Sequence, residues 1–246
     1  MSVTKLHFAR FEFKYVLPAA LRKELEAELQ YFLEYDPFVA DQKNHEYVVR
    51  SLYFDDPFYT CFSDKVEGVH TRSKFRVRTY TKVRSVKAPQ FLEIKGRYNN
   101  LVLKHRTPIG DGSAIKDHSG ERLVQNLLGA VEPSKVSRRF EFELYRKRLR
   151  AVALIDYARR PYISRFDPEF RLTFDSALKA TQTSALFPAA GATKRSVLPG
   201  YTVMEVKFRR HIPSWFHRLI QAYELRRVSV SKICRGMEAL GMAQDI

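Results

Sequence analysis

The sequence predicts an α+β protein with an antiparallel β-sheet or barrel and flanking helices. Charged and apolar residues alternate with a period of two in about eight segments, which is typical of strands with one polar face. Most of these segments follow one another without an intervening helix, and this favours hairpin connections over a doubly wound α/β fold. The 246 residues contain no internal repeat and no clear linker. We therefore expect one domain, residues 1–246.

Periodicity and turn residues place the expected elements along the chain. The expected strands are residues 10–17, 47–56, 74–80, 90–97, 100–109, 151–162, 169–178 and 201–210. Helices are expected at residues 18–36, 120–131, 213–225 and 229–240. Residues 138–150 are compatible with a strand or a helix end, and Pro57 with the start of a short helix. Small and turn-forming residues at 181–200 predict a loop, which we expect to be the most mobile segment.

The charge balance indicates a polyanionic partner. The chain has 43 Lys and Arg against 27 Asp and Glu, a formal net charge of +16. Nucleic acid, an anionic membrane surface and a phosphate-rich small molecule are all compatible with this excess. Cys61 and Cys234 are isolated, the histidines are scattered, and neither a membrane span nor a signal peptide is found. We expect a cytoplasmic protein with reduced thiols and no histidine metal centre.

Cations recur on one face of the expected strands. In KFRVRTY, residues 74–80, Lys74, Arg76 and Arg78 alternate with Phe75 and Val77. The other strands repeat the pattern with Glu12 and Lys14; Glu93, Lys95 and Arg97; Lys104 and Arg106; Tyr157 and Arg159; Arg171, Thr173 and Asp175; and Glu205 and Lys207. A solvated outer face explains any single strand. The recurrence across several strands favours an anion-binding cavity lined by the charged face of the sheet, with helices covering the apolar face. The solvated face and the anion-binding cavity both remain open interpretations.

Nine short motifs resemble a known family in their order along the chain. They are RFEFKY, SLYFDD, KFRVR, FLEIKGR, LKHR, DYARRPY, FRLTFD, VMEVKF and VSKIC, and they extend from about Lys5 to Cys234. Each motif alone is weak, but the ordered set resembles the VTC (vacuolar transporter chaperone) domain. This family contains polyphosphate polymerases within the triphosphate tunnel metalloenzymes, the CYTH-like superfamily. The resemblance implies an eight-stranded antiparallel β-barrel, a tunnel that binds a triphosphate or a polyphosphate chain.

The resemblance also implies which residues bind phosphate. Carried over position by position, these are Lys14, Lys74, Arg76, Arg78, Lys95, Lys104, Arg106, Arg159, Arg171, Lys207 and Lys232. Among them it implies catalytic roles for Arg76, Arg78, Lys95 and Lys207. Lys232 is a looser match, because the family often has an aromatic residue after this lysine and this chain has SKIC.

Glu205 resembles the principal metal ligand of the family, with Glu12 and Glu93 as further candidates. For Glu12 and Glu93, a role as counter-ions to neighbouring lysines is an equal alternative. Ligation by oxygen alone suits Mn²⁺ or Mg²⁺. Hydrolases and cyclases of the superfamily begin with Glu-x-Glu-x-Lys, whereas this chain has Arg10 at the first of these positions. This departure favours the polymerase branch.

Four further residues are given supporting roles, and one phosphate site is excluded. Tyr53 and Tyr157 are expected to pack in the strand wall with hydrogen-bonded hydroxyls. Asp55 and Asp175 are expected to hold arginines in place. The sequence lacks the GxxxxGK[ST] motif, which excludes a P-loop as the phosphate site.

These features predict a metal-dependent polyphosphate polymerase, a transferase that moves the γ-phosphoryl group of ATP onto a growing inorganic polyphosphate chain. ATP and polyphosphate are the expected partners, and a separate membrane protein is a further candidate partner. A tunnel-fold triphosphatase and a non-catalytic polyphosphate-binding module are alternatives. A nucleic-acid binder is disfavoured for two reasons. The cations occupy alternate strand positions that would face the inside of the expected barrel, and no nucleic-acid motif is found.

Overall fold

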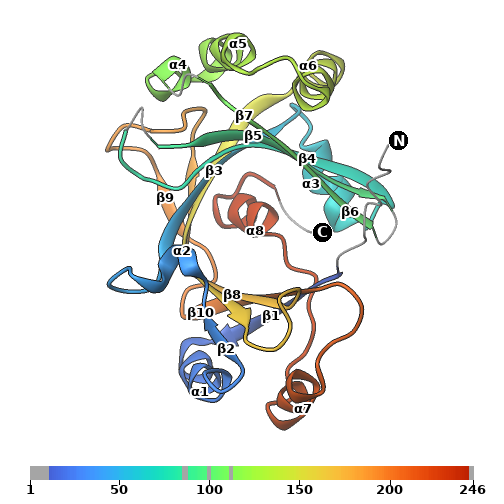
Figure 1. Cartoon of the computed structure of the whole chain (residues 1–246). Coiled ribbons are helices and arrows are strands. Elements are labelled where there is room, and N and C mark those ends of the chain that lie inside the picture. Colours follow the sequence, from blue (N-terminus) through green and yellow to red (C-terminus); the bar gives the residue numbers. More distant parts are fainter. Residues whose placement is uncertain (1–10, 85–87, 99–100, 111–112, 244–246) are drawn as a thin grey trace, which may run out of the picture. The chain divides into compact units, whose positions relative to one another are not determined.

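A computed structural model describes residues 11–84, 88–98, 101–110 and 113–243. Its strands are β1 (Phe11–Pro18), β2 (Leu33–Tyr35), β3 (Tyr47–Asp55), β4 (Thr71–Thr79), β5 (Gln90–Tyr98), β6 (Leu101–Pro108), β7 (Arg150–Ser164), β8 (Arg171–Gln182), β9 (Lys194–Ser196) and β10 (Tyr201–Phe208). Its helices are α1 (Ala19–Leu29), α2 (Pro37–Ala40), α3 (Thr60–Val66), α4 (Ser113–Lys116), α5 (Gly120–Ala130), α6 (Lys135–Lys147), α7 (Ser214–Ala222) and α8 (Lys232–Ala239). Figure 1 labels these elements.

The strands form one sheet with the order β1-β10-β8-β7-β3-β4-β5-β6, to which β2 adds on β7 and β9 on β8. The strand pairs with a described register are antiparallel. This confirms the predicted α+β class, with eight antiparallel strands in hydrogen-bonded order and flanking helices. The order has two ends, β1 and β6, so the sheet is open.

The chain divides into two compact units. Unit 1 contains Met1–Glu46, Arg160–Asp175 and Gly200–Ser229, and unit 2 contains Tyr47–Arg159, Ser176–Pro199 and Val230–Ile246. Strands β7 and β8 contribute residues to both units. The expectation of a single domain therefore stays a prediction.

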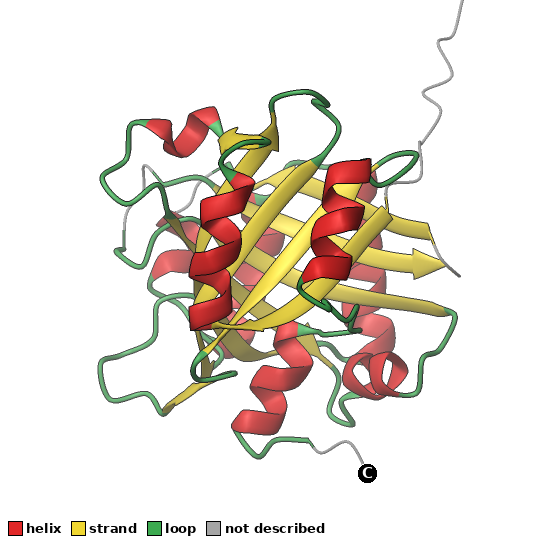
Figure 2. Cartoon of the chain, turned by 90° about the horizontal axis from the view of Figure 1, so that it is seen from below, coloured by secondary structure: helices red, strands yellow, loops and turns green. Residues whose placement is uncertain are grey.

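In unit 1, the apolar face of the strands packs against α1 and α7. Tyr15, Met204 and Phe174 are cross-strand neighbours on β1, β10 and β8, and all three are buried. Leu25 of α1 and Phe216 of α7 are fully buried in the same cluster. Figure 2 views the chain from below and shows these helices lying across the strands. The opposite parity of the same strands carries the charged residues, as the alternation predicted.

Unit 2 follows the same rule with α5 and α6. Phe54, Phe75 and Ile94 are cross-strand neighbours on β3, β4 and β5, and they are buried. Phe140 of α6 packs against them, with its ring centroid 5.3 Å from that of Phe54, and Leu127 of α5 lies in the same cluster. Helices thus cover the apolar face of these strands in Figure 1.

Helix α8 packs on the other face of the unit 2 strands. A Cβ atom added at Gly236 would lie 2.4 Å from Ile155 Cδ1 and 3.2 Å from Ala180 Cβ. Ile155 pairs with Ser51, and Ser51 pairs with Arg78, so this contact lies on the face that carries the cations. The absence of a side chain at Gly236 allows the helix to approach this closely.

Several ambiguous segments have a definite structure. Residues 138–150 form most of α6, whose capping box joins Ser134 and Ser137, and the helix ends at Arg148, which has a left-handed φ of 54°. The expectation of a loop at 181–200 was wrong in part, because β9 lies there and Leu186 and Phe187 are buried. The short helix expected at Pro57 begins at Thr60. Strand β2 and helices α2 and α4 were not expected.

Arg10, which carries the expected departure from Glu-x-Glu-x-Lys, lies outside the described residues. Within the described ranges, no helix is long and apolar enough to cross a membrane.

The aromatic residues of α6 allow a matched test of this packing. Phe140 is fully buried, whereas Phe142 is 63% exposed two positions along the same helix. We expect Phe140→Ala to lower the free energy of unfolding by about 3–5 kcal/mol, through lost burial and the cavity that remains. Phe142→Ala should change it by less than about 0.5 kcal/mol. Urea unfolding of both variants measures the difference, and equal losses would contradict this packing.

Candidate functional site

The charged face of unit 2 consists of rows of cross-strand neighbours. One row is Tyr53, Arg76, Glu93 and Arg106; the next is Lys74, Lys95 and Lys104; a third is Ser51, Arg78 and Phe91. A further row, Arg72 and Arg97, continues the same parity on β4 and β5. These residues share one side of the sheet because alternate positions of a strand point the same way.

Glu93 is the centre of this face. It is fully buried, and its Oε2 lies 2.6 Å from Arg76 Nη2 and 3.8 Å from Arg78 Nε. Its Oε1 lies 3.0 Å from Lys104 Nζ. Burial alone would raise the pKa of Glu93, but the charges of Arg76, Arg78 and Lys104 outweigh burial and lower this pKa from 4.5 to about 2. Glu93 is therefore ionised near neutral pH and compensates several cations.

Two tyrosine hydroxyls hold the arginines of this face in position. Arg76 Nη1 donates to the Tyr53 hydroxyl at 2.9 Å, and Arg78 Nη2 donates to the Tyr157 hydroxyl at 3.3 Å. Arg78 also donates from Nε to Ser51 Oγ at 3.0 Å. Burial raises the pKa of Tyr53, but Arg76 and Arg78 outweigh it, so the pKa of Tyr53 is lowered. The expectation that both tyrosines pack in the wall with hydrogen-bonded hydroxyls is confirmed.

The lysine row places like charges directly opposite one another. Lys95 pairs with Lys74 on one side and with Lys104 on the other. Lys74 Nζ also lies 2.5 Å from Ser231 Oγ, the N-cap of α8. Like charges in direct cross-strand pairs repel, and a bound anion would relieve this repulsion.

Aromatic rings support three further cations. Lys232 Nζ lies 5.1 Å and Arg159 Cζ 5.3 Å from the ring centroid of Tyr157. Arg106 Cζ lies 4.0 Å from the ring centroid of Phe91. Such contacts orient a cation.

The charged face of unit 1 is smaller and contains two rows. Lys14, Glu205 and Thr173 form one row across β1, β10 and β8, and Glu12, Lys207 and Arg171 form the next. Glu205 is buried, with its carboxylate oxygens 3.8 Å from Lys14 Nζ and 3.5 Å from Lys207 Nζ. Lys14 Nζ also lies 3.3 Å from Glu12 Oε1.

The donors around Glu205 fit a hard divalent ion. The buried hydroxyl of Thr173, its cross-strand neighbour, has no hydrogen-bond partner among the described residues. Mg²⁺ is usually held by one or two carboxylates and takes its remaining ligands from water and substrate phosphates. Among the described residues, no group of three or more His, Cys, Asp or Glu side chains is placed to hold a metal ion by itself.

The structure groups the predicted residues by unit. Unit 2 carries Lys74, Arg76, Arg78, Glu93, Lys95, Lys104, Arg106, Arg159 and Lys232, and unit 1 carries Glu12, Lys14, Arg171, Glu205 and Lys207. Their functional roles stay predictions. For Glu93, the contacts with three cations support the counter-ion alternative.

One residue was assigned wrongly and two were missed. Asp55 does not hold an arginine in the described contacts: its carboxylate accepts backbone N–H bonds from Asp56, Cys61 and Phe62 at the start of α3. Arg72 and Ser231 were not singled out, and Arg97 was placed on the charged face but not among the phosphate-binding residues. The parity of β4 could have indicated Arg72, whereas the position of Ser231 depends on how α8 packs.

The lowered pKa of Glu93 predicts a pH-dependent stability. The ionised carboxylate contributes about 3 kcal/mol above pH 5, and this contribution is lost as the pH falls from about 5 to 2. Glu93→Gln should therefore be less stable than wild type at pH 7, and the difference should shrink towards pH 2. Urea unfolding in buffers without phosphate or sulfate measures this. Glu67→Gln removes an exposed carboxylate as a control. A difference that does not vary with pH would contradict the role of Glu93.

Comparisons with known proteins agree with this geometry. One solved structure is a proposed adenylyl cyclase from Hippeastrum with a dominant triphosphatase activity. It has a TM-score of 0.56 and 14% identity, covering 94% of this chain and 95% of that chain. Another is a proposed adenylate cyclase from Bacillus halodurans, with a TM-score of 0.52 and 11% identity, covering 91% and 94% of the two chains. At these identities the likeness shows the fold alone.

No curated protein matches the sequence. The family model described as the VTC domain matches residues 9–241, which is nearly the whole chain. The family match agrees with the ordered motifs. This chain therefore belongs to the VTC domain family.

Proposed function

We propose that this protein is a polyphosphate polymerase that transfers the γ-phosphoryl group of ATP to a growing inorganic polyphosphate chain. The observation that carries the proposal is the cationic face of unit 2, where arginines and lysines fill successive rows around one buried carboxylate. Such a face suits a ligand with many regularly spaced negative charges. Membership of the VTC domain family supports the same substrate class.

The transfer requires positioning and charge neutralisation. A terminal oxygen of the polyphosphate chain forms a bond to the γ-phosphorus of ATP. The bond from that phosphorus to the β,γ-bridging oxygen breaks, and its electron pair leaves with ADP. The attacking oxygen is already anionic, so the step requires no protein base. Cationic groups that hold the donor and acceptor phosphates together reduce the repulsion between them.

The residues of unit 2 divide between rigid and compact cations. Arg76 and Arg78 are held by Glu93, Tyr53 and Tyr157, so their guanidinium groups are oriented before a ligand binds. Arginine binds phosphate oxygens through planar, forked donors. Lys95 and its row supply compact charges for neighbouring phosphates. In unit 1, Lys14, Arg171 and Lys207 would take the same role.

A divalent ion, Mn²⁺ or Mg²⁺, fits the donors around Glu205. Glu205 and the Thr173 hydroxyl would hold it, with Glu12 nearby on the adjacent row. When bound, such an ion would act as a Lewis acid that stabilises negative charge developing during the transfer. Lys14 and Lys207 keep the Glu205 carboxylate in place from both sides.

A tunnel-fold triphosphatase is the second candidate, because the similar protein from Hippeastrum has a dominant triphosphatase activity. The length of the cationic face favours the polymerase. From Arg72 to Arg78, β4 covers roughly 20 Å at the usual rise per strand residue. A triphosphate, with three phosphorus atoms, covers only part of that length, whereas a polymer would contact each row.

Product analysis tests the proposal. Purified protein with ATP and Mn²⁺ should form long polyphosphate, visible on a gel, and release ADP. Lys95→Ala should lower this rate about tenfold or more, because the lysine row contacts the reacting phosphates. Lys23→Ala removes an exposed charge from α1 and should leave the rate unchanged. Free phosphate without polymer would favour the triphosphatase, and neither product would favour a binding module.

Glu205→Gln tests the metal assignment. This change keeps the side-chain shape but removes the charge that would hold the ion. We expect turnover to fall steeply, because the ion acts on charge that develops during transfer. Metal-free polyphosphate binding should survive or strengthen, because one negative charge has left a cationic face. The rate is measured against Mn²⁺ concentration, alongside the metal-free affinity. An active variant with an unaltered metal curve would show that Glu205 is only a counter-ion.

A further inference from the structure

Helix α6 exposes a stripe that is both basic and aromatic. We call it the α6 stripe: Lys135, Arg138, Arg139, Phe142, Tyr145 and Arg146. These positions recur at intervals of three and four residues, so they lie on one side of the helix. Phe142 is 63% exposed and Tyr145 is 70% exposed. The opposite side of α6 is fixed by Phe140 and Leu144, which are buried in the core of unit 2.

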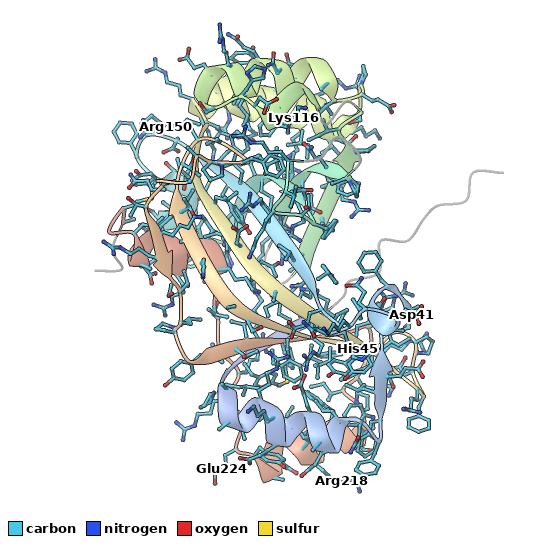
Figure 3. The ribbon with its side chains drawn as sticks, turned by 90° about the vertical axis from the view of Figure 1, so that its left-hand side faces the viewer. Asp41, His45, Lys116, Arg150, Arg218 and Glu224 are labelled. Atoms are coloured by element: carbon cyan, nitrogen blue, oxygen red, sulfur yellow. The ribbon has the colours of Figure 1, made fainter. Side chains whose placement is uncertain are left out.

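The stripe contains no acidic residue. The carboxylates of α6, Glu141 and Glu143, flank the stripe on its two sides, three or four residues from its members. Glu143 lies 2.6 Å from Arg146 and neutralises that charge in part. Lys135, Arg138 and Arg139 are exposed, and Arg148 and Arg150 add exposed cations just after the helix. Figure 3 labels Arg150 beside the helical layer.

The stripe is separate from the proposed phosphate-binding face. Helix α6 covers the apolar side of the unit 2 strands, whereas Arg76, Glu93 and α8 lie on the other side. A ligand of the stripe would therefore leave the charged face of unit 2 open. The rings of Phe142 and Tyr145 are exposed and take no part in the core around Phe140 and Leu144, and Arg139 donates one hydrogen bond to Ser73 Oγ of β4 at 3.3 Å.

We propose that the α6 stripe docks on an anionic lipid surface. Its cations complement lipid phosphates, and each cation near such a surface adds to the attraction. Phe142 has no hydrogen-bonding group, so a partner must supply an apolar phase for its ring to gain from binding. The boundary between headgroups and acyl chains supplies that phase, and the amphipathic ring of Tyr145 suits the same depth. A soluble polyanion would meet the cations but leave the Phe142 ring in water.

Vesicle flotation tests this surface. Wild-type protein should float with phosphatidylcholine vesicles that contain about one-third phosphatidylglycerol, and far less with phosphatidylcholine alone. Arg138→Glu/Arg139→Glu/Arg146→Glu should weaken binding about tenfold or more. Phe142→Ser/Tyr145→Ser keeps every charge and should weaken binding severalfold. Thermal melting verifies that the variants fold, which is expected because these side chains are exposed.

Matched variants separate the stripe from the overall positive charge. Arg84→Glu/Lys116→Glu/Arg122→Glu makes the same change in net charge elsewhere in unit 2, and Phe58→Ser/Phe166→Ser removes two other exposed rings. Both should bind vesicles within about twofold of wild type. Equal losses in the two charge variants, or no loss in the stripe's aromatic variant, would overturn the proposal. The stripe variants should also be tested for binding to single-stranded RNA. If they lose more affinity for RNA than for vesicles, the proposal is overturned in favour of a nucleic-acid surface.

Discussion

Repulsion among cations on adjacent strands is the constraint on which the rest of the structure depends. Directly opposed side chains leave the sheet from Cβ atoms about 5 Å apart, so cations at their ends repel unless the side chains diverge or a counter-ion lies between them. Unit 2 reduces this repulsion in one row with the buried carboxylate of Glu93. In the next row, Lys74 and Lys95 are directly opposed, and Lys104 contacts Glu93 of the neighbouring row at 3.0 Å. An anionic ligand on this face would lower the repulsion among its cations.

The same constraint explains why the helices lie where they do. A strand with cations at one parity must bury its other parity, and Phe75 and Ile94 are buried under α5 and α6. In unit 1, Tyr15 and Met204 are buried in the cluster that contains residues of α1 and α7. Alternate strand residues point to opposite faces of the sheet, so each unit can have an apolar core on one face and a high density of charge on the other.

Strand parity also decides what the sequence could predict. It placed the strands and the membership of the charged faces, because both follow from a period of two. Residues 138–150 were ambiguous because RFEFEL alternates like a strand, while Phe140 and Leu144 are also spaced like the buried side of a helix. The counter-ion environment of Glu93 depends on the register of three strands, which the sequence does not encode locally. Likewise, the burial of Leu186 and Phe187 comes from tertiary packing and not from local pattern.

The two buried glutamates show how neighbours rather than residue type set a carboxylate's role. Glu93 has an arginine nitrogen at 2.6 Å and a lysine nitrogen at 3.0 Å, and its pKa of about 2 reflects this saturation. A metal ion there would have to displace cations that are already in place. Glu205 has its lysines at 3.5 and 3.8 Å, with a buried hydroxyl oxygen on the neighbouring strand. An ion added at Glu205 would gain oxygen donors from this carboxylate and from the Thr173 hydroxyl, which is why we propose the metal site in unit 1 and not at the centre of the cationic face.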